Sequence, residues 1–205
     1  MKKSMLKLVF AALGLVGAAV PALAQESPWL VRVRAVHIDP ADKSDPVGGT
    51  GASDRLHVSD KWIPEVDISY YFTPNWAAEL VLTVPQKHDV TLDGKRIGSF
   101  KHLPPTLLAQ YHFLPGAQID PYVGAGINYT LISKVDILNG AGRLEHDSVG
   151  AALQAGVDIR IDKQWSVNLD VKKVQIRSDV DIGGARASRV KIDPVLLGVG
   201  IGYRF

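Results

Sequence analysis

The chain has 205 residues, of which 46% are hydrophobic, and it contains 23 basic and 21 acidic side chains but no cysteine. The excess of positive charge lies at the amino terminus. Removal of residues 1–24 would take away three lysines and no acid, which leaves 20 basic and 21 acidic side chains. We therefore expect no basic patch for nucleic acid. Without disulfides, the chain must be held by a core or a closed sheet.

Residues 1–24 have the three parts of a secretory signal peptide. Three lysines precede an apolar stretch of 13 residues from Leu8 to Val20, and a small-residue pattern ends at Ala24. A helix that crosses a bilayer needs about 20 apolar residues, so this stretch is too short to be a membrane anchor. We predict that residues 1–24 are removed on export and that residues 25–205 form the mature protein.

In the mature chain, eight segments alternate in hydrophobicity with a period of two, and each is about as long as a tilted transmembrane strand. These segments are Trp29–His37, Ile63–Phe72, Trp76–Val84, Leu103–Phe113, Pro121–Leu131, Val149–Ile161, Trp165–Ile176 and Val195–Phe205. Short connections alternate with long ones at 38–62, 85–102, 132–147 and 177–193. We therefore predict an all-β fold, an eight-stranded antiparallel transmembrane β-barrel of the outer-membrane type with short periplasmic turns and long external loops.

One face of these segments is apolar, and the opposite face carries five acidic and five basic side chains. The charged positions are Arg32, Arg34, Glu65, Asp67, Glu79, Asp158, Arg160, Asp170, Lys172 and Arg204. A soluble sandwich would also alternate, but the signal peptide, the even number of strands and the loop asymmetry favour a membrane barrel. The charged face then points into the lumen, where paired charges would fill the barrel.

Aromatic side chains gather at the strand ends that lie next to the short turns or the chain termini. They are Trp29, Phe72, Trp76, Phe113, Trp165, Tyr203 and Phe205. Amphipathic rings favour the boundary between membrane and water, so this set predicts one interfacial belt at the periplasmic edge.

Four stretches resemble the OmpW family of small outer-membrane proteins. They are His102–Tyr111, Pro121–Thr130, Asp147–Gln175 and Asp193–Phe205. The resemblance implies a monomeric barrel in the outer membrane of Gram-negative bacteria through which small hydrophobic molecules diffuse. It also implies contact with outer-membrane lipid and lipopolysaccharide. A terminal aromatic such as Phe205 resembles the signal that is read by the barrel-insertion machinery.

The resemblance also points to a constriction in the lumen. In the family, bulky apolar side chains on strands three and seven close the inner end of an apolar funnel, and the matching positions here are Val81 and Lys172. A lysine departs from that pattern, and Asp170 on the same face could pair with it. We therefore expect a preference shifted towards polar or anionic-headed solutes.

Five prolines lie towards the external ends of strands, namely Pro64, Pro85, Pro104, Pro105 and Pro194. Proline cannot donate a ladder hydrogen bond, so it either ends a strand at a loop or opens the wall. The interior of an eight-stranded barrel is filled by side chains, which leaves no straight pore. We predict that solutes enter from the loops and leave sideways near Leu103, Pro104, Pro105 and Pro64.

Enzymatic and metal-dependent functions find little support in this sequence. No Ser/His/Asp set has a spacing that fixes catalytic geometry, and no histidine pair has metal-ligand spacing. We expect no catalytic residues, no cofactor and no metal, and we interpret His112 as a hydrogen-bonded lumen histidine. The alternative function is a structural, adhesion or phage-docking protein without a transport role, whose flexible loops meet a host or a phage.

Overall fold

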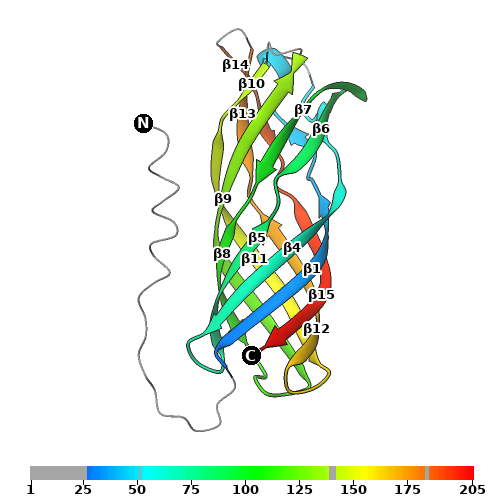
Figure 1. Cartoon of the computed structure of the whole chain (residues 1–205). Coiled ribbons are helices and arrows are strands. Elements are labelled where there is room, and N and C mark those ends of the chain that lie inside the picture. Colours follow the sequence, from blue (N-terminus) through cyan, green and yellow to red (C-terminus); the bar gives the residue numbers. More distant parts are fainter. Residues whose placement is uncertain (1–26, 51, 139–141, 183–184) are drawn as a thin grey trace, which may run out of the picture.

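The computed structural model describes residues 27–50, 52–138, 142–182 and 185–205, and they form a closed antiparallel β-barrel (Figure 1). The predicted signal peptide lies outside the described residues. In the described part, no helix is long and apolar enough to cross a membrane.

Eight strands close the lower half of the barrel, the end at which the short turns and the C-terminus lie (Figure 1). They are β1 (Trp29–Asp39), β4 (Lys61–Tyr71), β5 (Trp76–Thr83), β8 (Thr106–His112), β9 (Ile119–Ile137), β11 (Asp147–Arg160), β12 (Trp165–Val174) and β15 (Val195–Arg204). Each pairs with its neighbour along the chain, β15 pairs with β1, and every pairing is antiparallel. The predicted eight-stranded barrel is confirmed.

Shorter elements extend the barrel at the opposite end. They are β2 (Lys43–Ser44), the 3-10 turn η1 (Val47–Gly49), β3 (Leu56–Val58), β6 (Gln86–Leu92), β7 (Lys95–Leu103), β10 (Gly142–Leu144), β13 (Arg177–Ile182) and β14 (Ala185–Lys191). In Figure 1, β6, β7, β10, β13 and β14 lie beyond the lower strands.

Two of the predicted external loops, 85–102 and 177–193, are therefore largely β-hairpins. The β6–β7 hairpin turns through Asp93 and Gly94, both with positive φ, which is the two-residue turn that hairpins favour. The Asp-Gly pair was the sequence signal for this hairpin. The strands were missed because their outward positions are charged, as in Lys87, Asp89 and Lys101.

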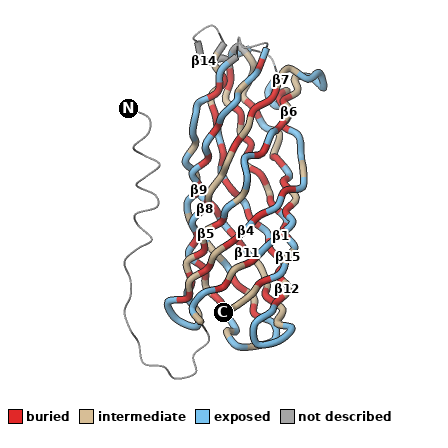
Figure 2. The backbone as a smooth tube through the Cα atoms, in the orientation of Figure 1, coloured by how far each residue is buried: buried red, intermediate tan, exposed pale blue. Residues whose placement is uncertain are grey.

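Buried and exposed positions alternate along the lower strands, as the bands of colour in Figure 2 show. The exposed positions are apolar, for example Val33, Leu107, Ile127, Leu153 and Val199. An outward apolar band around a closed sheet is the surface that a bilayer covers. The lower strands thus span the membrane, and the charged outer faces of β6 and β7 lie beyond it.

The seven aromatic residues of the predicted periplasmic belt lie at the turn end and are at least partly exposed. Their rings meet edge to face: Tyr203 lies 4.9 Å from Trp165 and 5.0 Å from Phe205 between ring centroids. Tyr70 packs against Trp29 and Tyr111 packs against Trp76, so both tyrosines belong to the belt. They were missed in the sequence analysis because they lie further from the strand ends than Phe72 and Phe113 do.

Inward glycines make room for large polar side chains in the narrow lumen. A Cβ atom at Gly156 would lie 2.4 Å from the Tyr122 hydroxyl, and one at Gly124 would lie 2.7 Å from Gln154 Oε1. Both contacts are shorter than packed atoms allow, so these positions set the space for Tyr122 and Gln154.

Candidate functional site

Two arginines of β1 lie at the centre of a buried charge network in the lower lumen. Arg32 donates to Glu79 at 2.8 Å and to Asp158 at 2.5 Å. Arg34 lies 3.3 Å from Glu79 and 3.0 Å from Asp67. All these side chains are buried, and they come from β1, β4, β5 and β11, so the network crosses the lumen from wall to wall.

Lys172 belongs to this network. Its Nζ donates to Glu65 Oε1 at 2.7 Å and to Asp170 Oδ1 at 2.8 Å, and all three side chains are buried. Two carboxylates within hydrogen-bond distance neutralise the ammonium group. This pairing argues against the expectation that Lys172 favours anionic-headed solutes, since its charge is already matched inside the protein.

Uncharged polar residues, which the sequence analysis did not single out, complete the network. The Tyr122 hydroxyl donates to Asp170 at 2.9 Å and accepts from Asn168 at 3.0 Å. Gln154 donates to Glu79 and to Asp170, both at 2.8 Å. Their positions in the two-residue alternation already indicated that these side chains point inward. Only charged residues on that face were considered in the sequence analysis, and these residues were therefore not selected.

Arg160 and Arg204, also predicted for the charge network, lie apart from its centre. They line a polar pocket at the periplasmic end together with Tyr71 and Asp158. Arg204 donates to the carbonyl of Ser27 at 3.0 Å, and its guanidinium lies 4.2 Å from the centroid of the Tyr71 ring. Each arginine is the last residue of its strand, and both are half-buried.

His112 is hydrogen-bonded inside the lumen at this end. Its Nε2 lies 3.0 Å from the Tyr71 hydroxyl and its Nδ1 lies 2.9 Å from Asp120 Oδ2. Both partners are buried, so the ring is held on two sides. Together with the charge network, this group fills the lower lumen.

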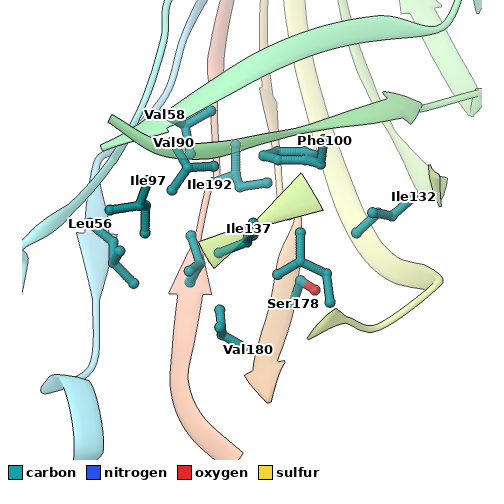
Figure 3. Close-up of a pocket in the computed structure, with 12 residues that line it drawn as sticks. Leu56, Val58, Val90, Ile97, Phe100, Ile132, Ile137, Ser178, Val180 and Ile192 are labelled. Carbon is teal, nitrogen blue, oxygen red and sulfur yellow. The ribbon is translucent and has the colours of Figure 1, made fainter. Parts of the chain in front are cut away.

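Above the network, the interior becomes apolar. An upper cavity is lined by eleven apolar side chains and Ser178. Figure 3 shows Phe100, Ile137, Val180 and Ile192, from β7, β9, β13 and the β14–β15 connection, around the same space. These residues lie in the extensions outside the membrane or, for Ile137, at the upper end of β9, so the apolar interior begins at the external end.

A lower cavity lies between the upper cavity and the charge network. Val81, Lys172 and Pro104, which the sequence analysis assigned to the constriction and the opening, all line it. Its floor contains Glu65 and Lys172 of the network. The two cavities are adjacent, because Phe100 of the upper lining lies 6.0 Å from His102 of the lower lining between ring centroids.

The wall beside the lower cavity is interrupted. The β5–β8 ladder ends at Thr106, and the β6–β7 ladder begins at His102. In the described wall, no ladder pair joins the intervening Leu103–Pro105 with Leu82–Pro85. We call Pro64, Leu82–Pro85 and Leu103–Pro105 the wall junction.

The same place is weakly paired on its other side. The β4–β5 ladder ends at the pair Glu65–Thr83. On this side, ladder pairs resume only at Val90, where β6 pairs with β3. Pro64 pairs with Ala35 in the β1–β4 ladder, and on the β5 side its carbonyl accepts a hydrogen bond from the Thr83 hydroxyl at 2.8 Å. The backbone around Pro64 is therefore regularly paired with β1, but above Glu65 it has no ladder pair with β5.

The side of the junction that faces β9 is closed. The Tyr129 amide donates to the Pro105 carbonyl at 3.0 Å, and Asn128 Nδ2 lies 3.2 Å from the carbonyls of Pro104 and Pro105. These bonds satisfy the carbonyl groups that the missing ladder would leave unpaired. The missing ladder pairs are thus confined to the side of the wall junction that faces β5 and β6.

Residues 25–205 match the sequence profile of the OmpW family. The chain belongs to the OmpW family. Over 186 residues it is 45% identical to an uncharacterized outer-membrane protein of Sinorhizobium fredii, which covers 87% of this chain and 80% of that protein. It is 28% identical over 196 residues to the dibenzothiophene metabolism operon protein PahQ of Pseudomonas aeruginosa, with 91% of this chain and 93% of that protein covered.

Among solved structures, this OmpW-family barrel is similar to the outer membrane protein OprG from Pseudomonas aeruginosa. The TM-score is 0.77 at 25% identity, and the match covers 88% of this chain and 97% of OprG. The closed barrel, its outward apolar band and these relatives place the protein in the bacterial outer membrane.

Proposed function

We propose that the protein lets small hydrophobic molecules cross the outer membrane passively, from the external end into the two cavities and out through the wall junction. The observation that carries this proposal is the change in the polarity of the lumen lining at Lys172. Above it the lining is largely apolar, and below it the lumen is closed by buried ion pairs. An apolar solute gains nothing by entering that network, since it would have to break charge pairs in a water-poor interior.

The wall junction offers the alternative to an axial path. Pro104 lines the lower cavity and also lies in the interruption between β5–β6 and β7–β8. A strand without ladder bonds separates from its neighbour at lower cost than a paired strand does. The outward neighbours Leu82 and Val84 are exposed and apolar, so a solute that leaves here meets hydrocarbon.

Similarity to PahQ supports the chemical class of the solute. That relative is named for a dibenzothiophene metabolism operon, and dibenzothiophene is an apolar aromatic compound. An upper cavity with a single polar lining residue, Ser178, suits such a compound.

The test restores the ladder at the junction. A variant with Pro85→Val, Pro104→Val and Pro105→Thr regains the amide donors that proline lacks. We expect it to fold and to lose most of its uptake of an apolar aromatic probe into vesicles whose outer leaflet contains lipopolysaccharide. The matched control is Pro40→Val, between β1 and β2, combined with Pro46→Val, between β2 and η1, which should keep wild-type uptake.

A folded ladder-restored variant with unchanged uptake would contradict lateral exit. Uptake that is equal in protein-free vesicles and in vesicles with the wild-type barrel would contradict the transport role itself.

A further inference from the structure

A stack of three rings lies on the inner face of the β6–β7 hairpin, where the upper and lower cavities adjoin. His88 and His102 are nearly parallel, with ring centroids 4.7 Å apart and an interplanar angle of 11°. Phe100 lies 5.9 Å from His88. Phe100 lines the upper cavity and His102 lines the lower one, so the stack borders the proposed path of the solute.

Both histidines carry a nitrogen atom that has no hydrogen-bond partner. His88 Nε2 and His102 Nδ1 are fully buried and unpaired. Buried polar atoms are nearly always paired in native proteins, because an unpaired one costs free energy on desolvation. Two such atoms on stacked rings point to a ligand that fills this position.

The chemistry of one of these atoms follows from its ring. His88 Nδ1 lies 2.7 Å from the carbonyl oxygen of Ser59, which can only accept, so Nδ1 carries the proton. In a neutral imidazole the other nitrogen is then a lone-pair acceptor. His88 Nε2 therefore requires a hydrogen-bond donor.

Burial favours the neutral form of both rings. Burial lowers the pKa of His88, and burial together with His88 and Lys61 lowers the pKa of His102 to about 3. The lowered pKa values of the two rings disfavour a cationic role for this pair at neutral pH. Nearby polar side chains of the lower cavity already have partners, since Asn128 binds Thr106 at 2.8 Å and Lys172 binds Glu65 at 2.7 Å.

We propose that His88 and His102 form a subsite that binds the hydroxyl group of a small hydroxylated aromatic solute. The hydroxyl donates to His88 Nε2, and the aromatic ring packs against the stack that Phe100 completes. This inference rests on the proposed transport function and names its solute class. A hydrocarbon would still pass, but it would leave the two nitrogen atoms unpaired.

The experiment compares naphthol with its methyl ether, which keeps the ring but cannot donate. Uptake is measured in vesicles with lipopolysaccharide in the outer leaflet and is corrected for the partitioning of each probe. One hydrogen bond predicts about a fivefold preference of the wild type for naphthol. His88→Phe keeps an aromatic ring in the stack, and it should take up both probes equally.

A second variant and a control variant test whether the preference for naphthol depends on this histidine pair. His102→Phe should also reduce the preference, and His57→Phe, at an exposed histidine on β3, should retain the wild-type value. A heat-dependent shift in gel mobility establishes that each variant is folded.

Each outcome is decisive. A wild type that takes up both probes equally overturns the subsite and means that the nitrogen atoms bind water only, while the transport proposal stands. A preference that survives in both folded variants also overturns the subsite. Failure of the wild type to take up either probe overturns the transport proposal instead.

Discussion

The lower and upper halves of the barrel follow the same two-residue alternation but place opposite chemistry inside. In the lower half, the outward positions are apolar and the inward positions are charged, with Arg32 and Arg34 at the centre. In the upper half, the outward positions of β6 and β7 are charged and the inward positions, such as Val90 and Phe100, are largely apolar. The polarity is inverted where the wall leaves the membrane.

This difference separates two tasks. Ion pairs that join opposite walls hold the membrane-spanning half together and close its axis. The apolar interior of the upper half can accept a solute because it lies outside the bilayer, where its outer face meets water. Changes in the lower half should therefore act on stability, and changes in the upper half should act on uptake.

The largest effect on stability is expected from Arg32→Met. This change leaves Asp158 without its buried cation and Glu79 with Arg34 alone, a loss worth about 3–5 kcal/mol for broken buried pairs. Urea unfolding in detergent micelles measures it. Arg96→Met, which breaks an exposed pair with Asp89, is the control and should unfold like the wild type. A stable Arg32→Met barrel would show that the network does not hold the lower half.

Lys172→Met should come next, at about 3 kcal/mol, because Glu65 and Asp170 lose the nearer of the two cations they share and keep only Arg34, at 3.3 Å from each. Its solute preference should match the wild type in the uptake assay, since the lysine is neutralised in place. A shift in preference between neutral and anionic probes would restore the expectation that was drawn for this residue from the family resemblance.

Tyr122→Phe is expected to have a smaller effect, about 1–3 kcal/mol, because the hydroxyl bridges Asp170 and Asn168 in a buried position. The ring and its contact with Arg32 are retained. Thermal unfolding followed by gel mobility measures the loss. An unchanged midpoint would mean that the hydroxyl is not part of the stabilising network.

Ile97→Glu should have the smallest effect on stability and a large effect on uptake. Ile97 is half-buried and lines the upper cavity, where a carboxylate would face apolar solutes. We expect the unfolding midpoint to stay near that of the wild type while uptake of apolar probes falls. Equal uptake by this variant would remove the upper cavity from the solute path.

The sequence predicted the lower half well because membrane-spanning strands impose a strict pattern. The outward row from Val195 to Ile201 and the inward row with Arg32 and Arg34 follow directly from the period of two. The family resemblance, through stretches such as Pro121–Thr130, pointed to the same fold.

The upper half and the partners inside the lumen were harder to foresee. The two-residue alternation alone does not distinguish a hairpin with a charged outer face from a polar loop. Only the Asp93-Gly94 pair indicated a hairpin turn. The grouping of Tyr122 with Asp170 depends on which strands face each other across the lumen, and the stack of His88 on His102 depends on the register of the β6–β7 hairpin. Sequence spacing does not contain that information.

The most direct test of the account asks where an apolar solute leaves the barrel. Because the chain has no cysteine, single cysteines can carry a small fluorophore at Val84 in the wall junction, at Val149 on the outer face of β11, or at Ser166 below the charge network. A quenching apolar solute is then added from the external side. We predict that quenching at position 84 precedes quenching at 149, and that position 166 is not quenched. Early quenching at 166, or simultaneous quenching at 84 and 149, would contradict lateral exit above a closed lumen.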